Sequence, residues 1–380
     1  MSTGKILVTG GAGFIGSHLV DRLVREGFSV RILDNLSKPT HDGIPPHLST
    51  EAEFIHGDVR NPDDVDKALE GVCGVFHQAA IGGFTRDIAP VIASNVHGTA
   101  VLLERIEKRF PHVEKIVVAS SVAVYGEGRY QCRVHGVIYP GLRAEGALSS
   151  GQWEQTCPTC QQTLAVARTP ESKPVSPETI YSITKYDQER MVLAKGREWG
   201  LPCVALRYFL TYGPRQSLRN PYTGICSIFS SQIANGKAPR IFEDGCQVRD
   251  FVHVQDVVTA NLLVYRDARA NSRVFNVGTG QATSVVAMAQ ILGRLLRKEI
   301  PPLLAGEFRL GEVRHLVSDI AQIESLGFRP AVSLQEGLRQ TIDWILTQGN
   351  VTDYFSQVVD VLRTARVIRQ ANLQQVSQSQ

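Results

Sequence analysis

The sequence predicts an α/β fold with a doubly wound parallel sheet, and three observations carry this prediction. Residues 6–8 form a short apolar run, and Gly10, Gly13 and Gly16 follow it at three-residue spacing. From Phe14 onward the chain has the spacing of apolar and polar residues that is typical of an amphipathic helix. Further short apolar runs alternate with helical patterns, as expected for buried parallel strands covered by helices on both faces.

The first strand, turn and helix are expected to bind the pyrophosphate of a dinucleotide, as in Rossmann-type domains. Glycine lets the backbone approach the phosphates, and the N–H groups at the helix start donate to them. The residues assigned to this contact are Gly10, Gly13, Phe14, Ile15 and Gly16. The second predicted strand, residues 29–33, leads to Asp34 and Asn35. An acid there accepts hydrogen bonds from the adenosine ribose and repels the 2′-phosphate of NADP, so NAD is the predicted cofactor.

Residues that follow the next strands are assigned to the same cofactor site. The third predicted strand ends in Asp58 and Val59. Asp58 either accepts the adenine amino group or caps the helix after it. The fourth ends in Ala79 and Ala80, whose small side chains leave room for a flat cofactor, and Asn95 stands near the start of a later helix.

A fifth predicted strand, residues 115–119, delivers polar groups to the edge of the sheet where ligands bind. Ser121 follows this strand, and Tyr181 and Lys185 lie further on at a spacing of four. Residues four apart share one face of a helix, and the charge of a lysine there favours the phenolate of the tyrosine. Thr85, in a glycine-rich loop, is positioned to face a ligand.

Length, net charge and cysteine content limit the classes to which the protein can belong. The 380 residues suit one large or two fused domains, and a formal net charge of +3 does not indicate binding to nucleic acid or a membrane. The chain contains no apolar run of membrane-spanning length and no signal-peptide pattern, so a cytoplasmic enzyme is expected. The seven cysteines do not suggest a disulfide framework. Four of them are expected in core-like surroundings: Cys73, Cys203, Cys226 and Cys246.

Together these motifs resemble the extended short-chain dehydrogenase/reductases, and more narrowly the NAD-dependent nucleotide-sugar epimerases and dehydratases. The resemblance covers roughly residues 4–346 and is broken by one insertion. Beside the residues already named, the matching motifs are residues 206–209, 212–216, 249–257, 276–280 and 311–315.

The resemblance implies a reaction at C4 of a sugar, with NAD that stays bound and is reduced only transiently. Tyr181 is then the base, Lys185 holds the nicotinamide ribose and tunes Tyr181, and Ser121 hydrogen-bonds the reacting oxygen. The resulting 4-keto sugar rotates in the site, and hydride returns to its other face. Arg249 and Arg314 match positions that hold the substrate diphosphate; the alternative for each is a surface salt bridge.

Two departures narrow the substrate and the reaction. The family's dehydratases carry an Asp-Glu pair after the position of Ser121, whereas this chain has Val122 and Ala123 there, so dehydration is disfavoured. The family usually has an asparagine after Arg-Tyr-Phe, but this chain has Leu210 and Thr211. Either Thr211 makes this contact with the substrate or the sugar phosphate sits differently, so ordinary UDP-hexose binding is in question. Arg215, in the matching motif at residues 212–216, is also assigned to the substrate.

The insertion, residues 127–175, contains two spaced pairs of metal-ligand residues. Cys132 with His135, and Cys157 with Cys160, have the spacing of a tetrahedral zinc site with four protein ligands, which is structural and not catalytic. A disulfide or redox pair within the second pair, and free thiols, are the alternatives. The inserted pattern also resembles a bacterial subgroup described as dTDP-L-rhamnose 4-epimerase-like. The insertion joins the Ser121 strand to the Tyr181 helix and is expected to form a lid, a pocket wall or a subunit contact.

The predicted domains follow from this order of motifs. Residues 1–206 form the NAD-binding domain, and residues 207–350 form a smaller mixed α/β substrate domain. A part at about 248–275 returns to the first domain, and residues 351–380 are a C-terminal helix and tail.

The predicted function is C4 epimerisation of a nucleotide-diphosphate sugar, either a dTDP-deoxyhexose or a UDP-hexose. A 4,6-dehydratase or 4-ketoreductase on the same scaffold is the first alternative. A sensor that binds NAD and a sugar nucleotide without catalysis is the second. The resemblance also implies a homodimer formed by two helices of each subunit, near residues 96–110 and 181–199.

Overall fold

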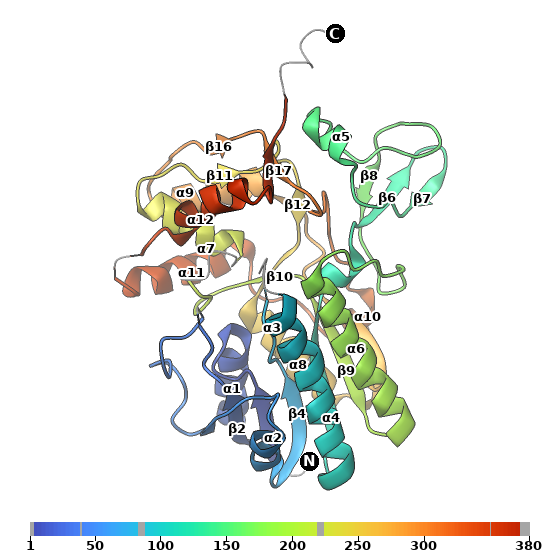
Figure 1. The fold of residues 1–380 in the computed structure, drawn as a ribbon, viewed down its shortest axis with the longest axis vertical. Coiled ribbons are helices and arrows are strands. Elements are labelled where there is room, and N and C mark those ends of the chain that lie inside the picture. Colours follow the sequence, from blue (N-terminus) through green and yellow to red (C-terminus); the bar gives the residue numbers. More distant parts are fainter. Residues whose placement is uncertain (1–3, 39, 83–87, 219–223, 350, 373–380) are drawn as a thin grey trace.

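The computed structural model describes residues 4–38, 40–82, 88–218, 224–349 and 351–372. Within them, a parallel sheet has seven strands in the order β3-β2-β1-β4-β5-β9-β14 (Figure 1). The strand bounds are β1 Lys5–Thr9, β2 Ser29–Asp34, β3 Glu53–His56, β4 Val72–His77, β5 Lys115–Ser121, β9 Cys203–Tyr208 and β14 Arg273–Val277. The strand order reverses beside β1, so the predicted doubly wound sheet is confirmed.

Helices cover both faces of this sheet because its strands are apolar on both sides. Ile6 and Val8 of β1 pack into one core together with α1 and α8. Leu7, between them, packs into a second core with α2, α4 and α6. The helix bounds are α1 Phe14–Arg25, α2 Pro62–Leu69, α3 Ile88–Ile92, α4 Gly98–Arg109, α6 Ile180–Trp199 and α8 Val254–Arg266, with a π-helical turn, η1 Ala93–His97, between α3 and α4.

The start of α6 is set by its own sequence. Thr179 accepts a hydrogen bond from the backbone N–H of Ser182, and the Ser182 hydroxyl accepts one from the backbone N–H of Thr179. This capping box satisfies two N–H groups that a helix end otherwise leaves unpaired. Gly200 ends the helix in the left-handed conformation. The first turn of α6, which carries Tyr181, is therefore held in place.

The described parts of residues 210–253, 283–309 and 334–372 form a smaller region at the upper left of Figure 1. Its core contains Phe229 of α7, Met288 of α9, and Leu338 and Ile342 of α11. Its elements are β10 Leu210–Tyr212, α7 Ile225–Ala234, β11 Arg240–Ile241, β12 Val248–Arg249, β13 Phe251–His253, β15 Thr283–Ser284, α9 Val285–Leu295, β16 Leu303–Leu304, β17 Glu307–Arg309, α11 Leu334–Thr347, α12 Tyr354–Thr364 and β18 Ile368–Gln370. Helix α10 Ala321–Glu324 packs instead against β14 of the large sheet. A short 3₁₀ turn, η3 Ala268–Ala270, lies between α8 and β14.

The insertion begins after a 3₁₀ turn, η2 Val122–Tyr125, and contains a small antiparallel sheet in the order β7-β6-β8. Its elements are β6 Arg129–Cys132, β7 Gly136–Ile138, α5 Glu145–Ser149 and β8 Ala165–Ala167. Figure 1 shows it beside the smaller region, to which Arg143 ties it through a buried ion pair of 2.8 Å with Glu243.

Two further findings concern the burial of the cysteines and the length of the helices. Cys203 and Cys226 are buried and Cys73 is half-buried, but Cys246 is exposed. The expectation of a core-like Cys246 is wrong because this residue lies in the loop before β12, not in a strand. No helix within the described ranges has the length and apolar character needed to cross a membrane.

Candidate active site

A cavity of about 720 Å³ lies at the carboxyl ends of β1, β2, β4 and β5, where the strand order reverses. Its volume is in the range of ordinary cofactor and ligand sites, about 300–1,000 Å³. The structure brings most of the predicted residues to its wall: Gly10, Gly13, Phe14, Ile15, Gly16, Asp34, Asn35, Val59, Ala79, Ala80, Ser121, Tyr181, Lys185 and Thr211. Thr85 lies outside the described residues.

The glycine turn has the geometry of a phosphate cradle. Gly10 has a φ of +69°, and a Cβ on Gly16 would lie 2.2 Å from the Gly10 carbonyl oxygen, so only glycine fits there. None of the described side chains caps the first turn of α1, which leaves its N–H groups available to an anion. Asp34 accepts hydrogen bonds from the backbone N–H groups of Ala12 and Leu36 at 3.0 and 2.9 Å. The residues present therefore fit a dinucleotide with an unphosphorylated adenosine ribose.

Ser121, Tyr181 and Lys185 meet at the other end of the same cavity. Ser121 ends β5, and the other two residues occupy successive turns of α6, which packs against β5. The Ser121 side chain is hydrogen-bonded to Tyr181 and also accepts from the backbone N–H of Ala123 at 3.1 Å. A hydroxyl, a phenol and an ammonium group on one wall form a site for proton transfer at a bound hydroxyl.

The protonation states of this site are set mainly by burial. Burial lowers the pKa of Lys185 to about 7. Burial raises the pKa of Tyr181, and the hydrogen bond with Ser121 opposes that rise. The Ser121 hydrogen bond is thus the protein contact that lowers the Tyr181 pKa in this structure, and the expected lowering by the charge of Lys185 stays a prediction.

Asp58 and Asn95 lie next to the cavity and not on its wall. Burial opposes ionisation of Asp58, but hydrogen bonds from Arg60 and Asn35 outweigh it and lower the pKa of Asp58 to about 2. The fully buried Asn95 accepts a hydrogen bond from the backbone N–H of Ile81 at 2.7 Å and donates to the Ile81 carbonyl oxygen at 3.0 Å. Asn95 thus holds a residue that itself lines the cavity.

The three predicted substrate arginines are engaged by other protein groups. Arg215, with a φ of +69°, pairs with Asp21 at 2.7 Å. The buried Arg249 donates to the backbone carbonyl oxygens of residues 248, 313 and 314 at 2.7–3.0 Å. Arg314 is fully buried. None of the three is among the described residues that line the cavity.

Arg314 is the centre of an ion cluster that joins the insertion to the smaller region. It donates to Glu243 and Asp244 at 2.9 and 2.8 Å, and its Nε donates to Glu154 of the insertion at 3.1 Å. Burial opposes ionisation of Glu154, but hydrogen bonds from His315 and Arg314 lower the pKa of Glu154 to about 2. Glu154 is therefore ionised at neutral pH.

The four predicted metal ligands converge in the insertion. The ligand atoms of Cys132, His135, Cys157 and Cys160 all lie within 4.8 Å of one another. Two of their separations are 3.6 Å, between the sulfurs of Cys132 and Cys160, and 3.4 Å, between Cys157 Sγ and His135 Nδ1. Hydrogen bonds from the backbone N–H groups of His135 and Val134 lower the pKa of Cys132 to about 6. Thiolates about 2.3 Å from one tetrahedral zinc are about 3.8 Å apart, so this donor set fits zinc.

Several residues of the cavity wall were not among the sequence predictions: Gln78, Ile81, Gly82, Pro90, Val91, Ser94, Ser120, Tyr208, Phe209, Gln216, Ser217 and Gly224. Gln78 and Phe209 directly follow β4 and β9, so their position at strand ends is a signal that could have identified them. Ser94 and Gly224 lie far from any such strand end, and no local signal marks them.

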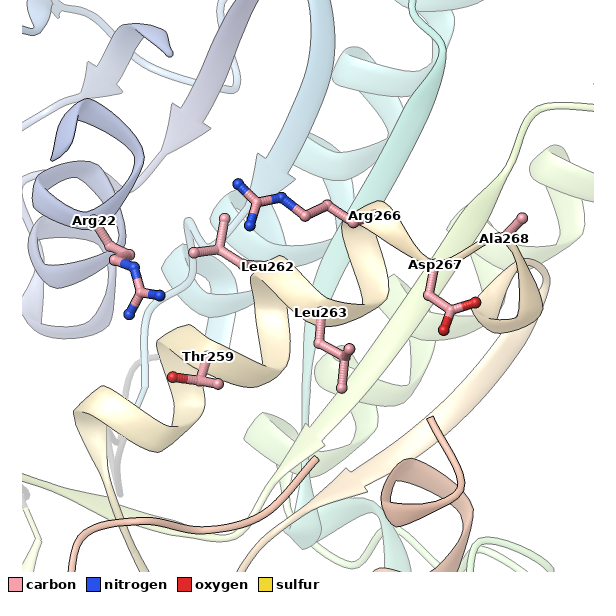
Figure 2. A pocket seen from close by; sticks show the side chains of 7 residues that line it. All are labelled: Arg22, Thr259, Leu262, Leu263, Arg266, Asp267 and Ala268. Carbon is pink, nitrogen blue, oxygen red and sulfur yellow. The ribbon is translucent and has the colours of Figure 1, made fainter. Parts of the chain in front are cut away.

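A second cavity, of about 480 Å³, lies between α1 and α8 and contains none of the predicted residues. Figure 2 shows Arg22 on α1 and Arg266 on α8 with Thr259, Leu262 and Leu263 on the same helix. Both guanidinium groups pair with the single carboxylate of Glu26. Because both guanidinium groups are already engaged by Glu26 and none of the predicted residues lines this cavity, we assign the chemistry to the larger cavity.

A glycine turn, an acid at the end of β2 and a Ser/Tyr/Lys set around one cavity are the features of a Rossmann-type protein with a dinucleotide-dependent active site. Comparison with family models is consistent with this. The chain belongs to the NAD dependent epimerase/dehydratase family, whose model matches residues 6–136 and 155–278. The gap between the two matched ranges, residues 137–154, lies inside the insertion.

Individual relatives agree over nearly the whole chain. The dTDP-L-rhamnose 4-epimerase of Burkholderia thailandensis is 34% identical over 90% of this chain and 94% of its own. The UDP-glucose 4-epimerase of Thermotoga maritima, solved with UDP-glucose, is 32% identical with a TM-score of 0.75, over 90% of this chain and 99% of its own. The UDP-glucose 4-epimerase of Thermus thermophilus, solved with NAD, is 29% identical with a TM-score of 0.71, over 91% of this chain and 100% of its own.

Proposed function

We propose that this protein is an NAD-dependent 4-epimerase of a nucleotide-diphosphate sugar. One observation carries the proposal: Ser121, Tyr181 and Lys185 share a cavity with the dinucleotide-binding turn. The similarity to dTDP-L-rhamnose and UDP-glucose 4-epimerases supports it. The substrate is a dTDP-deoxyhexose or a UDP-hexose.

The choice of epimerisation over dehydration rests on the carboxylates of the cavity. Among the described residues on its wall, Asp34 is the one carboxylate, and it ends β2. Ser121 ends β5, and β1 and β4 separate these strands in the sheet. Three strand spacings of about 4.8 Å place the two ends about 14 Å apart. Elimination of water needs an acid and a base beside the sugar, and Asp34 is too distant to serve as either.

Each of the three residues has a defined task at the reacting oxygen. NAD, when bound, supplies a reversible acceptor for the hydride of C4, the sugar carbon that carries the reacting oxygen. The Tyr181 oxygen, as phenolate, removes the proton from the C4 hydroxyl and returns it to the oxygen of the transient 4-keto sugar after that sugar has turned over. Ser121 donates a hydrogen bond to the same oxygen, and the charge of Lys185 favours the phenolate.

The test is Tyr181→Phe, assayed with a panel of nucleotide sugars by mass spectrometry and NMR without added NAD. The wild type should interconvert two sugars of equal mass, and the variant should lose about 10²–10⁴-fold in kcat. Tyr186→Phe, on the same helix but not on the cavity wall, is the control. A product lighter by one water would indicate a dehydratase instead. Unchanged turnover in Tyr181→Phe would remove the proposed base.

For substrate binding, we propose that the diphosphate contacts Arg249 and Arg314 between the two domains, and that Thr211 and Thr85 contact the sugar end. Residues 1–206 form the NAD-binding domain and residues 207–350 the substrate domain in this proposal. The packing of α8 on α1 and the pairing of β14 with β9 support the return of about 248–275 to the first domain. To reach Arg314, the diphosphate must replace Glu154, whose side chain is 39% exposed.

We further propose structural zinc at the Cys/His cluster and a cytoplasmic homodimer. The ligand separations and the lowered pKa of Cys132 support the metal. The dimer is supported by exposed apolar side chains on two helices in contact, Ile92 on α3 and Ile183 on α6, which are 44% and 41% exposed. The insertion, through Glu154 and Arg143, forms a wall beside the substrate arginines.

A further inference from the structure

A buried chain of polar side chains runs from Lys185 into the protein, and none of the steps above uses it. Gln188 lies one turn after Lys185 on α6. Its Oε1 accepts a hydrogen bond from the lysine ammonium at 2.7 Å. The Gln188 side chain is fully buried, and the Lys185 side chain is almost so. Gln188 is therefore a direct partner of a group on which the proposed reaction depends.

The orientation of the Gln188 amide is determined by its other partners. The Thr99 hydroxyl donates its hydrogen to the Asn95 carbonyl oxygen at 2.6 Å, so towards other groups it can only accept. Gln188 Nε2 lies 2.9 Å from Thr99 Oγ1 and 3.4 Å from the Ala79 carbonyl oxygen. Both of these atoms are acceptors, so the amide nitrogen must face them and the amide oxygen must face Lys185.

The chain ends in a histidine that carries no charge. His77 is fully buried, with Nε2 2.8 Å from Thr99 Oγ1 and Nδ1 2.7 Å from Thr9 Oγ1. Burial and the nearby Lys185 lower the pKa of His77 to about 3, so the ring is neutral at neutral pH.

Among the described residues, the titratable groups that face Lys185 are Tyr181 and Glu189 of α6 and His77 of β4. The Glu189 carboxylate is already engaged by Arg207 of β9 at 2.6 Å and by a hydroxyl of β5 at 2.7 Å. The direct partner of the ammonium is thus neutral, and the nearest carboxylate is compensated by an arginine.

We infer that Gln188 is a positioning residue for Lys185, which it holds at the cavity with a neutral acceptor so that the lysine charge acts on Tyr181. The inference rests on the roles proposed above for these two residues. A carboxylate at position 188 would offset the lysine charge, whereas an apolar side chain would leave the ammonium without its acceptor and favour the neutral amine. Both changes weaken the positive field at Tyr181.

The test compares Gln188→Glu and Gln188→Met with the wild type. Because the base must be ionised, the acidic limb of kcat/KM against pH should move to higher pH by about one unit in both variants. The direct readout is ultraviolet titration of tyrosinate in each protein with and without Tyr181→Phe, which isolates the ionisation of Tyr181. Gln232→Met is the control, since Gln232 is a buried helical glutamine of α7 that does not line the cavity. Gln232→Met should leave the pH dependence of kcat/KM and the titration of Tyr181 as they are in the wild type.

Two outcomes separate this inference from the proposed function. If either folded Gln188 variant keeps the wild-type pH limb and the wild-type Tyr181 titration, the positioning role is wrong and the epimerase proposal stands. If the wild type converts none of the sugars, or Tyr181→Phe is as active as the wild type, the proposed function is wrong. The tyrosinate titration needs no turnover, so it still decides whether Gln188 acts on Tyr181 through Lys185.

Discussion

The Asp34 carboxylate accepts a hydrogen bond of 3.0 Å from the backbone N–H of Ala12, which ties the end of β2 to the glycine turn after β1. One acid thus supports the phosphate cradle and faces the cavity with its charge. We therefore expect Asp34→Asn to weaken NAD binding and to lower the preference for NAD over NADP by at least tenfold, about 1.4 kcal/mol.

The measurement is titration of the cofactor-depleted protein with both dinucleotides. Asp63→Asn, at an exposed acid in the first turn of α2, is the control and should leave the preference unchanged. If Asp34→Asn bound NADP no better relative to NAD than the wild type does, the assignment of Asp34 to the ribose would be lost.

A second prediction concerns the metal. Purified protein should contain about one zinc per chain, and Cys157→Ser should lose it and lower the midpoint of thermal unfolding by several degrees. The reason is that the small core of the insertion has few other apolar residues, chiefly Tyr130 and Leu164. Cys246→Ser changes an exposed thiol outside the cluster and should keep both metal and stability. Less than about 0.3 zinc per chain, with Cys157→Ser as stable as the wild type, would exclude a structural site.

Much of the nucleotide-binding half is predictable because its signals are local. Residues 6–8 and the glycines after them mark β1 and its turn within a few positions. Tyr181 and Lys185 share a helix face because of their spacing alone. The Cys/His cluster is also foreseeable, since each pair is close in sequence and only the meeting of the two pairs is long-range.

What the sequence does not reveal are contacts between distant positions. Glu154 and Arg314 are 160 residues apart, and nothing near either residue indicates that they pair. The role of Gln188 depends on Thr99 and His77, which come from other elements of the sheet and its helices. Arg314 was therefore predicted as a site residue without its surroundings, because its partner Glu154 is brought to it by the packing of the insertion.

A third prediction follows from that packing. In the proposed binding mode a diphosphate competes with the Glu154 carboxylate for Arg314, to which Glu154 is hydrogen-bonded. Glu154→Gln removes that carboxylate, so KM for the nucleotide sugar should fall about three- to tenfold with kcat within about twofold. Glu145→Gln, at a more exposed acid of the same insertion that pairs with Arg369, should change neither. Steady-state kinetics on the substrate found in the panel gives both values. A higher KM in Glu154→Gln would mean that Glu154 holds Arg314 ready for substrate and does not compete with it.

The last prediction concerns assembly. Ile183 is an exposed residue of α6, and α6 contacts α3, which carries the exposed Ile92; apolar side chains that gather on one surface mark a candidate protein contact. Ile183→Glu places a charge at the centre of the proposed dimer contact and should give monomers, because an unpaired buried charge costs several kcal/mol. Leu346→Glu, at a residue of α11 that is 62% exposed, is the control and should remain dimeric. Sedimentation velocity over a range of concentrations distinguishes monomers from dimers. A wild type that stays monomeric would exclude the dimer. An Ile183→Glu variant that stays dimeric would place the dimer contact elsewhere.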